Sequence, residues 1–219
     1  MQLLDLPPII VREKGKEGLS TRTRPQTSAL SPRDLKRLVG RAKQGNIEAF
    51  QQLYGVYSRK ILNYIFRLTG SRQEAEDLTQ DTFVLAYKNL PSLKQNERFQ
   101  SWLFRIAQNN VYQLYRNQKA PTTSLDERED TEMPADQRMA STELNPEELM
   151  LSGELGEIVE RVIRELPEKY KTVFIMSALH KLSYKEISEI VGRSLASVKS
   201  DIHRARVDVR DQVKRYLGR

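Results

Sequence analysis

Side chains that could bind nucleic acid gather near the end of the sequence, in a helix expected to begin near residue 195. Apolar residues at helical spacing predict its buried stripe: Val198, Ile202, Ala205 and Val209. The remaining positions turn hydroxyl, imidazole and cationic groups outward or sideways: Ser197, Lys199, Ser200, His203, Arg204 and Arg206. Such groups can bind base edges and phosphates. The pattern predicts contact with duplex DNA, and its alternative is a basic face exposed to solvent.

The residues before this helix complete a helix-turn-helix pattern. Ser183 and Glu186 match a capping box that opens a short helix, and Gly192 to Ser194 predicts a tight turn. A short helix, a glycine turn and a longer basic helix are typical of helix-turn-helix DNA-binding proteins. Because many regulators carry this motif, it indicates DNA binding without specifying the function.

A second set of polar side chains lies on a helix expected from Ser71 to Leu90, ended by Pro91. The positions expected to pack inward are Ala75, Leu78, Thr82 and Leu85. Another face carries residues three and four apart: Asp77, Gln80, Asp81 and Val84. This polar face with one apolar element suits a protein partner. Helix geometry alone favours a solvated acidic face.

The segment after Pro91 could bind single-stranded nucleic acid. A polar loop from Ser92 to Arg98 leads into a helix expected from Phe99 to about Asn117. Basic, polar and aromatic side chains can share one face of that helix: Arg105, Gln108, Tyr112 and Arg116. Such a face binds backbone and bases, or is merely exposed to solvent. Trp102 is expected in the core, where large aromatic residues dominate, and its alternative is a platform on which a base stacks beside Phe99.

These residues are positioned by an all-α fold of two small helical domains. Residues 1–30 lack apolar periodicity and predict a disordered tail. Residues 31–117 predict a bundle of four helices, and residues 146–219 a smaller domain that ends in the helix-turn-helix. Residues 118–145 are expected to form a flexible acidic linker, since residues 117–150 hold three Lys or Arg against nine Asp or Glu.

Composition excludes several classes of function. The 219 residues carry a formal net charge of +7, which favours a polyanionic partner. The sequence has no cysteine and only two histidines, so we expect no metal site, thiol chemistry or cofactor. No nucleophile or phosphate-binding loop suggests an enzyme. The most apolar stretch, 172–179, is far shorter than the roughly 18 residues of a membrane span. We therefore expect a cytoplasmic protein without membrane insertion.

Two blocks of the sequence resemble one family. The stretch from Glu76 to Phe83 and the stretch from Phe99 to Ala107 with Asn109 resemble region 2 of the extracytoplasmic-function (ECF) sigma factors. Four later motifs are similar to region 4: Leu166 to Glu168, Leu182 to Ile187, Val198 to Ser200, and Arg204 to Arg206. The resemblance spans about residues 32–216, with an acidic segment between the blocks.

The resemblance implies a non-enzymatic factor that binds core RNA polymerase and directs transcription initiation at promoter DNA. Region 2 would grip the clamp helices of the largest subunit through or beside Asp77, Gln80, Asp81 and Phe83. Its loop would capture a base flipped from the melted minus-10 element, using residues that fit this need: Lys94, Gln95, Asn96, Arg98 and Phe99. The face of Arg105, Gln108, Tyr112 and Arg116 would contact the same strand.

Region 4 would bind the minus-35 duplex through the outward residues of the last helix, from Ser197 to Arg206. The resemblance also implies contact with the polymerase flap region and an inhibitory anti-sigma factor. In the family the position after Lys199 and Ser200 is often basic, whereas here it is Asp201, which would repel phosphate if it faced DNA. A free-standing helix-turn-helix regulator is the alternative. It leaves the face from Asp77 to Phe83 without a role.

Overall fold

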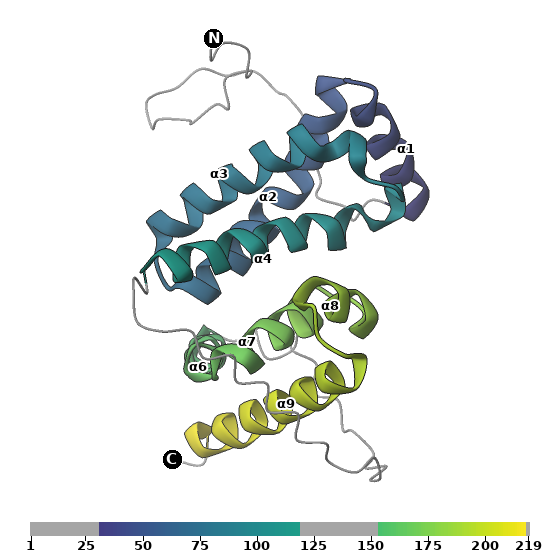
Figure 1. Cartoon of the computed structure of the whole chain (residues 1–219). Helices are drawn as coiled ribbons and strands as arrows, with labels where there is room; N and C mark the ends of the chain where they lie inside the picture. Colours follow the sequence, from purple (N-terminus) through teal and green to yellow (C-terminus); the bar gives the residue numbers. More distant parts are fainter. Residues whose placement is uncertain (1–30, 119–152, 218–219) are drawn as a thin grey trace.

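A computed structural model describes residues 31–118 and 153–217, and within these ranges every regular element is helical (Figure 1). The all-α prediction is confirmed. The predicted tail lies outside the described residues, as do residues 119–145 of the predicted linker and the start of the helix expected from Asn145, while residue 118 is the last residue of the fourth helix. Among the described helices, none is long and apolar enough to cross a membrane.

The N-terminal module contains α1 (Pro32–Lys43), α2 (Ile47–Thr69), α3 (Arg72–Asn89) and α4 (Phe99–Gln118), with two 3₁₀ turns, Leu90–Ser92 and Asn96–Arg98, before α4. Three helices begin at side-chain caps: Ser31, Asn46 and Ser71 each accept a hydrogen bond from a backbone N–H in the first turn. Gly70 ends α2 in the left-handed region at φ 72°. These local signals place the helix boundaries where the sequence predicts them.

The core of this module forms around α2, which packs against α1, α3 and α4. The largest fully buried side chains include Tyr64 on α2 and Phe104 on α4, whose ring centroids lie 5.1 Å apart. Tyr57 and Phe99 make a second contact of this kind at 5.4 Å. Packing of α2 against α4 therefore fixes the surface that α4 turns outward.

The C-terminal module contains α6 (Gly153–Glu165), α7 (Glu168–Phe174), a π-helical turn (Ile175–Leu179), α8 (Tyr184–Val191) and α9 (Leu195–Leu217). Ser183 and Glu186 form both hydrogen bonds of a capping box, as predicted. Gly192 adopts φ 68°, a left-handed conformation that lets the chain turn sharply from α8 into α9. The helix-turn-helix is thus present in the structure.

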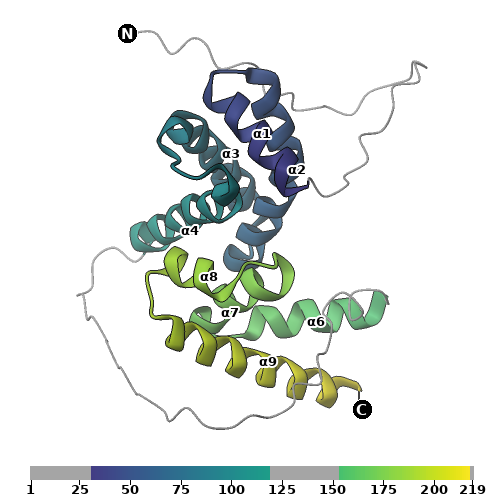
Figure 2. The same cartoon turned by 90° about the vertical axis from the view of Figure 1, so that its right-hand side faces the viewer.

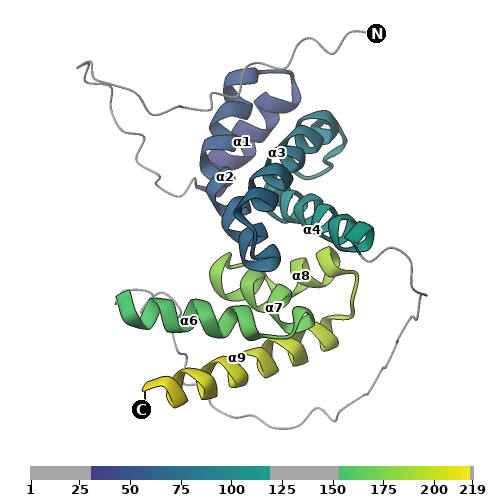
Figure 3. The same ribbon diagram turned by 90° about the vertical axis from the view of Figure 1, so that its left-hand side faces the viewer.

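The two modules contact each other through α4 and α8, and through α2 with α6 and α7. Figures 2 and 3 show α8 directly beneath α4, with α9 on the side of the C-terminal module away from the bundle. Among the described residues, these ion pairs cross the boundary: Arg67 with Glu160, and Arg98 Nη1 with Glu189 Oε2 at 2.8 Å. Gln100 Nε2 also donates to the carbonyl oxygen of His180 at 3.0 Å.

Candidate nucleic-acid interface

The outward face of α9 carries the predicted duplex-binding side chains. Five are exposed, namely Lys199, Ser200, His203, Arg204 and Arg206, while Ser197 is half-buried. The apolar stripe packs inward as expected, with Val198, Ile202, Ala205 and Val209 buried. Because α9 lies away from the N-terminal bundle, the compact arrangement leaves this face accessible (Figure 1).

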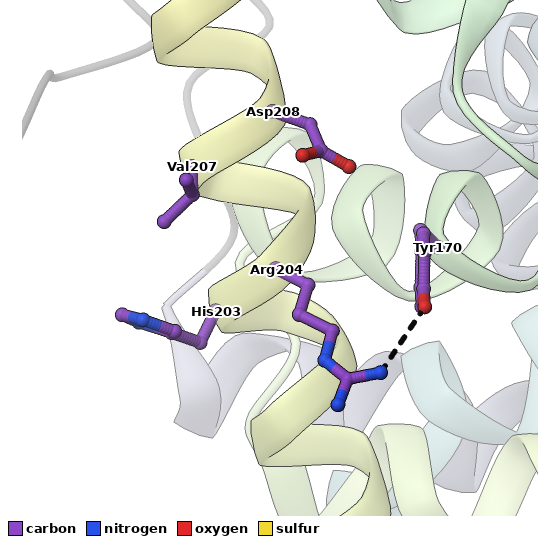
Figure 4. A pocket seen from close by; sticks show the side chains of 5 residues that line it. All are labelled: Tyr170, His203, Arg204, Val207 and Asp208. Atoms are coloured by element: carbon purple, nitrogen blue, oxygen red, sulfur yellow. Dashed lines mark hydrogen bonds between the residues drawn. The ribbon is translucent and has the colours of Figure 1, made fainter.

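A shallow cavity of about 420 Å³ borders this face, lined by Tyr170, His203, Arg204, Val207 and Asp208. Figure 4 shows Arg204 pointing toward Tyr170, to whose hydroxyl oxygen Arg204 Nη1 donates at 3.4 Å. His203 projects from another side of α9. Tyr170 on α7 therefore orients Arg204 beside the helix, a contact that the sequence alone did not indicate.

Asp201 does not face the surface, so the condition under which it would repel phosphate is not met. Its side chain points into the module and the residue is 3% exposed. Asp201 pairs with Arg193 in the turn and, at 3.7 Å, with Lys169 on α7. An inward carboxylate has no direct contact with a DNA backbone, so Asp201→Arg would break buried pairs and would not strengthen DNA binding.

On α3, the face predicted to meet a protein partner is exposed. Asp77, Gln80 and Asp81 are all exposed, and Gln73 Nε2 donates to Asp77 Oδ2 at 3.3 Å. Leu85 was expected inside but is 38% exposed, so it adds an apolar side chain to this face. An acidic face with an exposed leucine is a reasonable protein-binding surface.

Phe83 lies beneath this face and not on it. The residue is buried, with its ring 4.7 Å from that of Tyr54 and 6.5 Å from that of Phe50. Both contacts are edge-to-face and join α3 to α2. Phe83 can therefore hold α3 in position, but its buried side chain cannot contact a partner directly. Its assignment to the residues that touch the polymerase is wrong.

The loop between α3 and α4 is anchored to α1. Lys43 Nζ donates to the carbonyl oxygen of Leu93 at 2.7 Å, and Asn96 Nδ2 donates to that of Lys36 at 3.3 Å. Glu97 pairs with Lys36 at 2.6 Å, and this hydrogen bond lowers the pKa of Glu97. The loop thus presents Lys94 and Gln95 to solvent from a fixed backbone, while Asn96 is half-buried.

Two residues assigned to the single-strand site are buried. Gln108 is 2% exposed and accepts a hydrogen bond from the Tyr64 hydroxyl, so its placement on the outer face of α4 is wrong. Phe99 is fully buried between Tyr57 and Trp102 and offers no open wall. In contrast, Arg105, Tyr112 and Arg116 are exposed, with Tyr112 at 50%.

A pocket of about 270 Å³ lies on this outer face, at the junction of the α3 end and α4. Its lining combines amides, a hydroxyl, a cation and apolar walls: Asn89, Ser92, Trp102, Arg105, Ile106 and Asn109. Trp102 is half-buried and forms one wall, so it belongs only partly to the core. Sequence reasoning missed Asn89 and Asn109 as pocket residues. Helical spacing from Trp102 and Arg105 along α4 could have indicated Asn109, whereas Asn89 reaches the pocket from the end of α3 through packing between helices.

His180 is enclosed where the two modules meet. Its ring lies 4.7 Å from that of Phe104 and 5.8 Å from that of Tyr64, and its Nε2 is buried with no hydrogen-bond partner among the described residues. Burial, followed by the positive charges of Arg67 and Lys60, lowers the pKa of His180 to about 3. The imidazole is therefore neutral in the compact arrangement.

Comparisons with known proteins match both modules to one family. Residues 53–120 match Sigma-70 region 2, and residues 156–209 match Sigma-70, region 4. The chain is 34% identical over 182 residues to the ECF RNA polymerase sigma factor SigW of Bacillus subtilis, covering 82% of this chain and 97% of SigW. It is also 34% identical over 186 residues to the ECF RNA polymerase sigma-E factor of Escherichia coli K12, covering 83% of this chain and 95% of that protein.

Solved structures support the same fold. CnrH, solved in complex with the cytosolic domain of CnrY, aligns with a TM-score of 0.58 and 23% identity over 82% of this chain and 97% of CnrH. The sigma factor RpoE, solved with the anti-sigma factor NepR from Bartonella quintana, aligns with a TM-score of 0.57 and 19% identity over 77% of this chain and 98% of RpoE. The free-standing regulator does not explain the region 2 match. The chain therefore belongs to the ECF RNA polymerase sigma factors, with region 2 in its N-terminal module and region 4 in its C-terminal module.

Proposed function

We propose that three surfaces of this sigma factor bind three different targets during transcription initiation: core polymerase, the melted minus-10 strand and the minus-35 duplex. Residues 31–117 form the module that binds core polymerase and minus-10 DNA, and residues 146–219 form the module that binds minus-35 DNA. The observation that supports this most strongly is the exposed face of α9, where cationic and hydroxyl side chains surround a buried apolar stripe. Such a helix can enter a major groove and bind base edges with its first turns.

The upstream element is bound by the predicted residues of α9. Ser197, Lys199 and Ser200 lie in the first two turns, where a recognition helix meets base edges. Arg204, oriented by Tyr170, and Arg206 lie further along, where they bind phosphate or guanine. The roles differ in their salt dependence, because a phosphate contact releases counterions and a base contact does so only weakly.

The pocket beside Trp102 receives a base of the melted minus-10 strand. Its volume of about 270 Å³ and half-buried indole suit an unstacked base, while the amides of Asn89 and Asn109 can hydrogen-bond to the base edge. Arg105 and Arg116 then hold the strand backbone. Ser92 of the loop lines the pocket, and the exposed loop residues Lys94, Gln95 and Arg98 contact the same strand from a backbone that is anchored to α1.

The polymerase clamp is bound by the α3 face of Asp77, Gln80, Asp81 and Leu85. The acidic side chains supply charge complementarity, and exposed Leu85 supplies apolar area. Gln73 orients Asp77 through the side-chain hydrogen bond between them. The C-terminal module contacts the flap region of the polymerase.

Function requires that the two modules separate. The minus-35 and minus-10 elements of a promoter are centred about 25 base pairs apart. At about 3.4 Å per base pair, that separation along the DNA is roughly 85 Å. The compact arrangement holds Arg98 of the minus-10 loop within 2.8 Å of Glu189 on α8, so it does not span that distance. The chain between residues 118 and 153 has a contour length on the order of 100 Å, which permits the separation.

An anti-sigma factor is a further partner of this protein. The related sigma factor RpoE was solved in complex with the anti-sigma factor NepR, and CnrH was solved with the cytosolic domain of CnrY. The exposed clamp-binding face of α3 would be unavailable to polymerase while such a partner covers it.

A direct test combines the purified chain with sigma-free core polymerase and a genomic promoter library. Promoter-dependent transcripts that shift when Lys199 or Arg204 is replaced support the assignment. Tight binding to duplex DNA without any transcripts would instead favour a free-standing regulator.

A further inference from the structure

Asp201 is a charged residue in the middle of the DNA-binding helix that does not face DNA. Its carboxylate is nearly inaccessible, and buried carboxylates are costly unless they are paired. The two cations that face it come from different elements: Arg193 from the turn between α8 and α9, and Lys169 from α7. Asp201 therefore joins three elements of the helix-turn-helix module at one point.

Arg193 is held from several directions. Its backbone N–H donates to the carbonyl oxygen of Ser188 at 3.2 Å, and its own carbonyl oxygen accepts from Ser188 Oγ at 2.5 Å. Its guanidinium bonds to Asp201 and, at 2.8 Å, to Ser197 Oγ. The chain from α8 to the second turn of α9 is thus linked by side-chain contacts on both sides of the Gly192 turn.

Ser197 connects this network to the proposed DNA-binding face. Its backbone N–H donates to Ser194 Oγ at 3.1 Å, which caps α9, and its hydroxyl oxygen accepts from Arg193. Ser197 therefore stands between the buried pair and the exposed residues Lys199 and Ser200. Arg193 therefore contacts α9 at its first turn, through Ser197, and at its second turn, through Asp201.

We infer that Asp201 is a positioning residue for minus-35 recognition: it fixes Arg193 and thereby sets the orientation of the first turns of α9. This role depends on the proposed function of α9. Without the Asp201 carboxylate, Arg193 keeps its charge, loses its buried partner and can turn toward the DNA backbone. Base discrimination then falls while binding that does not depend on sequence persists, because a cation on phosphate carries no sequence information.

The test uses the full chain with core polymerase and a promoter library randomised at the upstream element. The informative variant is Asp201→Asn, which removes the charge and keeps the shape. Asp211→Asn is the matched control, since Asp211 is an exposed aspartate on the same helix that pairs with its neighbour Arg210. We expect Asp201→Asn to reduce discrimination between preferred and other upstream sequences at least tenfold, and Asp211→Asn to leave it unchanged.

Folding must be separated from positioning. The promoter-library experiment is therefore run at a temperature at which circular dichroism shows each variant fully folded. Arg193→Gln, at a half-buried position, provides a second way to remove the Arg193–Asp201 pair and should cause the same loss of discrimination. The double variant Arg193→Asp with Asp201→Arg restores opposite charges, so it should recover discrimination that either single change loses. Full discrimination in folded Asp201→Asn and Arg193→Gln would overturn the inference.

Failure of the proposed function gives a different result. If Ser200→Ala and Arg204→Ala both leave upstream preference unchanged, α9 does not bind that element and the proposed function itself is wrong. If those two variants alter the preference and Asp201→Asn does not, only the positioning role is wrong.

Discussion

Arg98, at the end of the loop before α4, pairs with Glu189 on α8 at 2.8 Å, so a residue proposed for minus-10 DNA contacts the module proposed for minus-35 DNA. Both side chains are 44% exposed, and an exposed pair of this kind contributes about 1 kcal/mol or less. The pair alone does not hold the modules together. It acts with the Arg67 and Glu160 pair and the enclosed His180 ring.

Reversing the two acidic partners should open the compact arrangement. In Glu160→Arg with Glu189→Arg, each pair becomes a repulsion between two cations. The compact form should lose about 1 to 3 kcal/mol, a value between those of exposed and buried pairs. Energy transfer between dyes on α1 and α9 should report a longer distance. The control is Glu157→Arg with Glu165→Arg, since both residues are exposed on α6 and neither forms an ion pair with another described residue. An unchanged distance between the dyes in the Glu160→Arg, Glu189→Arg variant would show that these ion pairs do not hold the two modules together.

Acid should favour separation of the modules. His180 has a pKa of about 3 when enclosed and about 6.5 when solvated, so the open form binds the proton more readily. The contribution of neutral His180 to the stability of the compact form is fully present above about pH 6.5. As the pH falls below 6.5, the compact form loses about 1.4 kcal/mol per pH unit relative to the open form. Between pH 7.5 and 5.5 the open fraction should rise about tenfold at constant ionic strength. Compared with the parent, His180→Phe should show little change, and an equal response in both would exclude His180 as the cause.

The α3 face should govern affinity for core polymerase. Asp77→Lys with Leu85→Ala removes one charged and one apolar contact, and we expect at least tenfold weaker binding, which is about 1.4 kcal/mol. Helical content should stay constant because both side chains are exposed. Fluorescence anisotropy with labelled core gives the affinity, and Glu48→Lys on α2 controls for the change in charge. Parental affinity in the folded double variant would remove this face from the interface.

The Trp102 pocket should affect promoter melting more than duplex binding. Asn109→Ala removes one amide from the pocket, and we expect fewer open complexes with unchanged affinity for core. Losing one hydrogen bond to the base edge costs about 0.5 to 1.5 kcal/mol. Permanganate footprinting measures melting, and a premelted bubble should recover part of the activity because opening is already complete. Gln51→Ala on α2 is the control. Normal melting with unchanged base preference in Asn109→Ala would exclude the pocket.

Local signals made most of the fold predictable. Caps at Ser31 and Ser71, the Ser183 capping box and the Gly192 turn act over a few residues, so sequence alone places these helix ends. The position of Leu85 was less predictable, because its burial depends on where neighbouring helices pack.

Buried polar residues in the candidate sites were not predictable. Gln108 lies inside because Tyr64, on a different helix, donates a hydrogen bond to it, and Asp201 lies inside because Arg193 and Lys169 compensate its charge. Residue type suggests solvent for both, and only their tertiary partners reverse that expectation. The contact between modules likewise depends on residues far apart in sequence, such as Arg67 and Glu160.

Transcription in a reconstituted system tests the central claim most directly. Purified chain and sigma-free core polymerase are combined with a promoter library, and transcript start sites are sequenced for the parent and for Arg204→Ala. We expect promoter-dependent transcripts that require the chain, with the upstream preference altered in Arg204→Ala and the start positions retained. Absence of chain-dependent transcripts, with core polymerase shown active alongside another sigma factor, would contradict the proposed function.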